Sequence, residues 1–195
     1  MYAYAIAGAI AIVVTAAIVV TVVMVTQVKS SSSSSDDDSG TVSLSTTAKL
    51  TYYSSYPACC PNSPNYNSKA DTTECADYSG CDYIGQFSAI GKKSFDYVQN
   101  HNLVAFYDNS DPNGDNFQKR YGGKSITISK TCNGVYYNFT SIIADTCGNS
   151  DCNNCCAQNA DKTSGILVDM EYYTVLRNFG NTDCASGKIT FSISG

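Results

Sequence analysis

Ten cysteines constrain this chain more than any other feature of its 195-residue sequence. Their even number allows up to five disulfides. Such a density of cysteine is typical of proteins that fold in an oxidising compartment. We therefore predict that every cysteine is oxidised and that the folded part of the chain lies outside the cell. The cysteines are Cys59, Cys60, Cys75, Cys81, Cys132, Cys147, Cys152, Cys155, Cys156 and Cys184.

A metal site is the alternative use of these cysteines. The spacings of Cys147 with Cys152, and of Cys152 with Cys155, resemble those of zinc-ligand pairs. The chain has one histidine, however, and no second C-x-x-C pair at zinc-finger spacing. We expect no metal and no cofactor, and zinc remains the minor alternative.

The first 28 residues differ in composition from the rest of the chain. Residues 2–28 carry no charge and are mostly alanine, isoleucine and valine. As a helix, a run of this length spans the roughly 30 Å core of a bilayer. We predict an uncleaved signal anchor at residues 1–28, with a cleaved signal peptide as the close alternative. The single flanking Lys29 favours a cytoplasmic domain, but the cysteines favour an extracellular or cell-surface one.

A polar segment follows the apolar one. Residues 30–40 read SSSSSSDDDSG, which cannot bury apolar surface and should form a flexible tether. We assign residues 29–47 to this tether and residues 48–195 to one folded domain. After the tether come 14 acidic and 11 basic side chains, so the domain lacks the basic surface of a nucleic-acid partner. We expect a monomer.

The domain has the pattern of a mainly β protein. Loops rich in glycine and asparagine separate six segments that are rich in β-branched and aromatic residues. These segments are residues 47–53, 102–107, 124–130, 136–145, 165–173 and 188–195. Only residues 94–101 and 170–179 suggest short helices. We predict a closed barrel with short helices and disulfide-rich loops, because closure removes exposed sheet edges.

Two aspartates interrupt apolar strand segments. Asp145 follows Ile142, Ile143 and Ala144, and Asp169 stands between Val168 and Met170. An aspartate at a strand end is commonly a turn residue. For a lone aspartate we would favour that interpretation, and spacing alone allows two such carboxylates to meet at one site. By contrast, we expect the nearby Glu171 to face solvent.

Residues 165–194, GILVDMEYYTVLRNFGNTDCASGKITFSIS, resemble the final segment of expansin-type double-psi β-barrels. The matched residues are Asp169, Met170, Arg177, Phe179, Gly180, Gly187, Lys188 and Ile189. Upstream, YYNFTSIIADTC resembles the family's strand that ends in an Asp-Thr-Cys corner. KLTYYSS resembles its opening strand, with Thr51 and Tyr52 at the Thr-Tyr pair. The resemblance covers residues 48–194 and is loose over residues 59–91.

The resemblance implies a six-stranded double-psi β-barrel with an open groove. In this groove Asp169 is the acid and Asp145 has a supporting role. Family-45 endoglucanases share the barrel and place a catalytic base just after the opening strand, where this chain has Ser54. A serine has no carboxylate with which to activate a water. An acid without a base is the pattern of expansins and loosenins, which loosen polysaccharide networks without appreciable hydrolysis.

The implied function is therefore non-hydrolytic loosening of a structural polysaccharide such as cell-wall β-glucan. A glycoside hydrolase or a lytic transglycosylase on the same barrel is one alternative, and a barwin-like binding or defence module is another. The chain has fifteen tyrosines and no tryptophan, and flat amphipathic rings suit sugar faces. We predict that Thr51, Tyr52 and Tyr172 bind the substrate. Asn138, in the sequon NFT, is a predicted glycosylation site.

Overall fold

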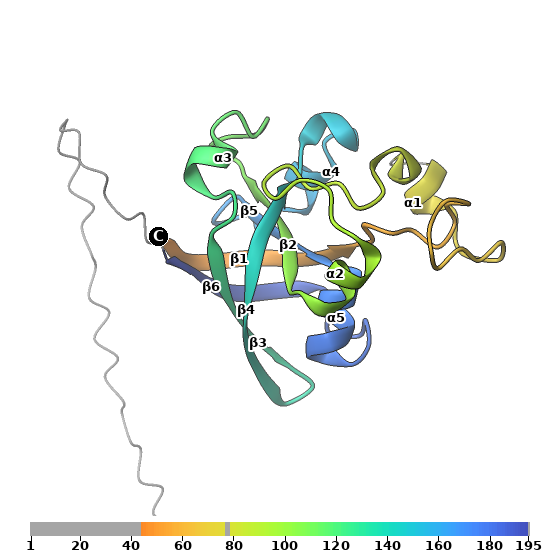
Figure 1. The fold of residues 1–195 in the computed structure, drawn as a ribbon. Helices are drawn as coiled ribbons and strands as arrows, with labels where there is room; N and C mark the ends of the chain where they lie inside the picture. Colours follow the sequence, from red (N-terminus) through yellow and green to blue (C-terminus); the bar gives the residue numbers. More distant parts are fainter. Residues whose placement is uncertain (1–43, 77–78, 195) are drawn as a thin grey trace, which may run out of the picture. The chain divides into compact units, whose positions relative to one another are not determined.

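The computed structural model of this protein describes residues 44–76 and 79–194 (Figure 1). The predicted signal anchor and most of the predicted tether lie outside these residues. Within the part of the chain that is described, no helix is both long enough and apolar enough to cross a membrane.

Six strands form a closed barrel with the order β1-β5-β2-β4-β3-β6. Their bounds are β1 (Leu44–Tyr53), β2 (Leu103–Asp108), β3 (Ser125–Cys132), β4 (Val135–Thr146), β5 (Ile166–Glu171) and β6 (Gly187–Ser194). Strand β1 runs parallel to β5, and β2 runs parallel to β4, whereas the other pairs are antiparallel. Each strand overlaps one predicted segment, so the prediction of a mainly β, closed six-stranded barrel is confirmed.

Short helices lie outside the strands. They are α1 (Thr73–Ala76), α2 (Phe95–Asn100), α3 (Phe117–Arg120), α4 (Cys155–Asn159), α5 (Tyr172–Phe179), and the 3-10 turns η1 (Gly80–Tyr83) and η2 (Asn149–Asp151). Helices α2 and α5 match the two predicted helices and lie side by side (Figure 1). Helix α5 is followed by the capping residue Gly180, whose φ of 80° is a left-handed conformation that glycine adopts without strain.

Side chains alternate between the inside and the outside of the barrel along each strand. In β5, Val168 and Met170 belong to the cluster that fills the interior. Leu167 packs outside the barrel against Tyr107, and Leu103 packs in a second outer cluster. Strands β2 and β5 are therefore covered on their outer face by two separate apolar clusters, with a gap between them.

All ten cysteines are paired, which confirms the predicted five disulfides. The pairs are Cys59–Cys75, Cys60–Cys81, Cys132–Cys184, Cys147–Cys156 and Cys152–Cys155. Two of these bridges hold the long connection between β1 and β2. Two more hold the loop between β4 and β5, and the Cys132–Cys184 bridge joins β3 to the segment before β6.

Removing the Cys132–Cys184 bridge should have a large effect on stability. Its cysteines are separated by 52 positions, and closing a loop of that size in the unfolded chain accounts for about 4 kcal/mol. We expect a double alanine variant to lose about this much free energy of unfolding in urea. The matched control removes Cys152–Cys155, with a separation of 3, and should lose only about 2 kcal/mol. Equal losses would contradict the prediction.

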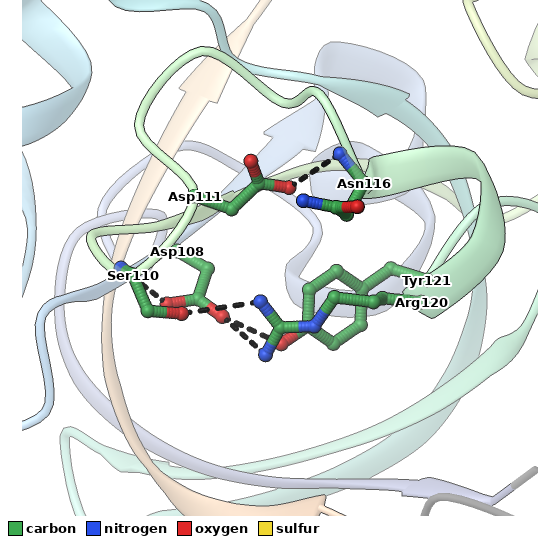
Figure 2. Close-up of polar contacts among 6 residues, drawn as sticks. All are labelled: Asp108, Ser110, Asp111, Asn116, Arg120 and Tyr121. Atoms are coloured by element: carbon green, nitrogen blue, oxygen red, sulfur yellow. Dashed lines mark hydrogen bonds and ion pairs between the residues drawn. The ribbon is translucent and has the colours of Figure 1, made fainter.

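A polar network anchors the loop that follows β2 (Figure 2). Tyr121 donates its hydroxyl to Asp108 Oδ2 at 2.6 Å, and Arg120 Nη2 lies 3.0 Å from the same oxygen. The backbone N–H of Ser110 donates to Asp108 Oδ1. Burial alone would raise the pKa of Asp108, but these hydrogen bonds and the Arg120 charge outweigh it and lower the pKa. The network therefore fixes this loop around an ionised carboxylate.

Candidate functional site

A cleft of about 670 Å³ opens between the two outer clusters. This volume falls within the roughly 300–1,000 Å³ of typical ligand sites. One wall is the Cys-rich loop after β4, and the opposite wall includes the buried Phe87. The two predicted catalytic residues, Asp145 and Asp169, both line the cleft, as do Thr51, Tyr52 and Ser54.

Strand register places the two carboxylates on either side of β2. Asp169 of β5 pairs with Ala105 of β2, and Ala105 pairs in turn with Asp145 of β4. Neighbouring strands lie about 4.8 Å apart, so the backbones of the two aspartates are separated by about 10 Å. The small side chain of Ala105 leaves the floor between them open. An irregularity in the β2–β4 pairing between Val104 and Ala105 sets this register.

Each aspartate is held by a different set of donors. Thr51, which pairs with Asp169 across β1 and β5, donates its hydroxyl to Asp169 Oδ1 at 2.6 Å. Asp145 Oδ1 accepts the backbone N–H groups of Ser88 and Thr146, each at 2.9 Å. Both side chains are half-buried. Strand β5 continues beyond Asp169, through Met170 to Glu171.

The tyrosines near the cleft differ in whether they line it. Tyr52 lines it and is 45% exposed. Tyr172 is not among the lining residues, but its ring centroid lies 6.5 Å from that of Tyr52. Tyr83, which is 62% exposed, also lines the cleft. No sequence pattern pointed to Tyr83 or Ser88, because both lie in the long disulfide-held connection, where no strand alternation predicts the direction of a side chain.

Glu171 does not face solvent, so that expectation is wrong. Its side chain is fully buried, although β5 alternation places it on the same outer face as Asp169. Ser55 Oγ donates to Glu171 Oε1 at 3.0 Å, and the backbone N–H of Tyr173 donates to Oε2 at 2.6 Å. Burial raises the pKa of Glu171 to about 7, against the opposing effect of these hydrogen bonds. The chain after β1 covers this residue, and local periodicity does not reveal such a cover.

The disulfides bear on the alternative of a metal site. Two groups of three cysteines bring their sulfur atoms within 4.8 Å of one another among the described residues. Every one of these sulfurs is bonded to another sulfur. Zinc takes cysteine as the thiolate, so the disulfides occupy the atoms that a zinc site would need.

Asn138 stands apart from the cleft. It lies on β4 with an exposed side chain, and its Nδ2 donates to Ser129 Oγ of β3 at 2.7 Å. Exposure is what glycan attachment requires, and glycosylation of Asn138 stays a prediction.

The fold and the cleft together define a class: a disulfide-rich, closed six-stranded β-barrel with two carboxylates in an open cleft. No family model matches the chain, and no match to it was found among curated proteins.

Proposed function

We propose that this protein binds a structural polysaccharide in the cleft and loosens it without hydrolysis, as expansins and loosenins do. The observation that carries the proposal is the row of Thr51, Asp169, Ala105 and Asp145 across four neighbouring strands, with Ser54 in the same cleft. The strand order and the two parallel pairs are consistent with a double-psi β-barrel.

The chemistry of the cleft suits a neutral sugar chain. Exposed rings such as Tyr52 and Tyr83 offer flat apolar faces to sugar rings, and their hydroxyls offer hydrogen bonds. Asp169 lines the cleft, and its proposed role is to donate a proton or a hydrogen bond to a glycosidic oxygen. Ser54 supplies no carboxylate at the position where the resemblance puts the base, and inverting hydrolysis needs a base carboxylate roughly 6.5–9.5 Å from the acid. The resemblance gives the other carboxylate of the cleft, Asp145, a supporting role and not that of the base. Binding without cutting is the outcome that this combination favours.

The location that we propose is the cell surface or the extracellular space. Five disulfides are typical of proteins from oxidising compartments. The predicted anchor at residues 1–28 would tether the barrel to a membrane through the Ser/Asp-rich segment. The partner that we propose is a cell-wall β-glucan or a similar structural polysaccharide.

Two measurements on the same samples test this proposal. The oxidised full chain is added to wall strips held under constant load and to suspensions of cellulose, chitin and mixed-linkage β-glucan. We expect binding and faster extension of the strips with no reducing sugar above background. Extension accompanied by steady sugar release would indicate the hydrolase or lytic alternative, and binding without extension would indicate a barwin-like module.

The variant Ser54→Asp serves as the positive control for sugar release. It places a carboxylate at the position that the resemblance gives to the base, in the same cleft as Asp169. We expect slight hydrolysis from this variant and none from the parent.

A further inference from the structure

The carboxylate of Glu171 joins two segments of the chain beside the cleft. Its Oε1 accepts hydrogen bonds from Ser55 Oγ at 3.0 Å and from the backbone N–H of Ser55 at 3.4 Å. Its Oε2 accepts the backbone N–H of Tyr173 at 2.6 Å, which also caps the first turn of α5. One oxygen therefore serves the segment after β1, and the other serves the start of α5.

Both segments carry residues at or beside the cleft. Residues 51–55 at the end of β1 all line it. The first residue of α5 is Tyr172, whose ring lies 6.5 Å from the ring of Tyr52. Strand pairing brings Tyr53 opposite Glu171, where the β1–β5 register ends. Beyond it, the Ser55 carbonyl accepts the backbone N–H of Gly85 at 2.9 Å, which holds Ser55 to the β1–β2 connection and not to α5. The Glu171 carboxylate thus joins the end of β1 to the helix that carries Tyr172.

The surroundings of Glu171 make this link sensitive to its charge. The side chain is fully buried, and a buried carboxylate is stabilised mainly by the donors aimed at it. From α5, the phenol of Tyr173 and the guanidinium of Arg177 interact with it electrostatically. From the β1 side, Ser55 contributes uncharged donors, and Tyr53 is the register neighbour. A proton on Oε2 would put a donor opposite the backbone N–H of Tyr173, whereas a proton on Oε1 can be accepted by the Ser55 hydroxyl once that hydroxyl turns.

We propose that Glu171 is a positioning residue of the cleft: its carboxylate ties residues 51–55 to the start of α5, and so sets how Tyr52 and Tyr172 meet a bound polysaccharide. The choice of a polysaccharide as the ligand rests on the proposed function, whereas the link between residues 51–55 and α5 does not. Glu171 does not itself line the cleft, so it acts through Ser55 and α5.

The geometric part is tested without any ligand. Backbone amide and tyrosine ring signals of the full chain, with its disulfides formed, are followed by nuclear magnetic resonance between pH 4 and pH 9. We expect the amides of Ser55 and Tyr173 to shift together with one midpoint near 7, because burial raises the pKa of their shared acceptor to about that value. In Glu171→Gln the shared titration should vanish, and the ring signals of Tyr52 and Tyr172 should move. Separate midpoints in the parent, or unmoved ring signals in the variant, would overturn the proposal.

Binding of cellohexaose then tests the consequence for the cleft. We expect Glu171→Gln to bind this probe about tenfold more weakly than the parent. Ser94 caps α2 and does not itself line the cleft, so the control Ser94→Ala should leave the affinity unchanged. Failure of the parent to bind the glucan probes would refute the proposed function on β-glucan, and the resonance experiment would still decide the role of Glu171.

A milder variant covers the case in which Glu171→Gln does not fold. Ser55→Ala removes one donor to Oε1 and leaves the backbone N–H of Ser55 in place. With fewer hydrogen bonds to the charged form, the midpoint seen at the Tyr173 amide should rise. The affinity for cellohexaose should fall by about threefold. A midpoint and an affinity equal to those of the parent would contradict the link through Ser55.

Discussion

Replacing Asp169 by asparagine is expected to abolish polysaccharide loosening while the barrel stays folded. Asparagine keeps the size of the side chain and an oxygen that can accept the Thr51 hydroxyl, now 2.6 Å from Asp169 Oδ1. It loses the acidic proton and the charge. Hydrogen bonds to charged groups contribute about 1.5–3 kcal/mol, so the extension rate of wall strips should fall by about tenfold or more. Binding should fall less, because aromatic contacts carry much of it.

The control for this substitution is Asp96→Asn. Asp96 is exposed in the first turn of α2 and does not line the cleft. Asp96→Asn changes the net charge by the same amount as Asp169→Asn. It therefore distinguishes an effect of net charge from an effect of losing the carboxylate in the cleft. The role of Asp169 would be refuted if Asp169→Asn extended wall strips at the parent's rate, or if Asp96→Asn lost as much activity.

The free energy of unfolding should fall by about 3 kcal/mol between pH 4.5 and pH 7 through Glu171 alone. Burial raises the pKa of this group from 4.5 to about 7 in the folded state. Between these values the folded protein holds a proton that the unfolded chain has released, so stability falls as pH rises. Each unit of pKa difference corresponds to about 1.4 kcal/mol. The contribution is complete below pH 4.5 and is lost above pH 7.

Urea unfolding of the parent and of Glu171→Gln at several pH values isolates this contribution. The parent should lose stability relative to the variant as pH rises from 4.5 to 7.5. Asp161→Asn is the control of opposite sign, because backbone hydrogen bonds from Ser164 and Thr163 lower the pKa of Asp161. Stability from Asp161 is therefore lost as pH falls. A stability difference between the parent and Glu171→Gln that did not change with pH would contradict the burial of an ionisable Glu171.

The sequence by itself determined the elements of this barrel. Enrichment in β-branched and aromatic residues between turn-rich loops is a local property of the chain. It predicted all six strands, and the segments around Phe95 and Tyr172 predicted two of the helices. The even number of cysteines predicted five bridges, but 10 thiols can pair in many ways. The pairing, such as Cys132 with Cys184, depends on which loops meet in space.

Only the tertiary structure decided how these elements form a cleft. Asp145 and Asp169 stood out in the sequence because charged side chains interrupt apolar runs. Nothing local shows that β2 lies between their strands, or that Ala105 separates them. Strand order arises from pairing between segments that are distant in the chain. The burial of Glu171 also depends on the tertiary structure. Alternation along β5 places its side chain on the outer face of the barrel. There it is buried by Ser55, which is 116 positions away in the chain, and by helix α5.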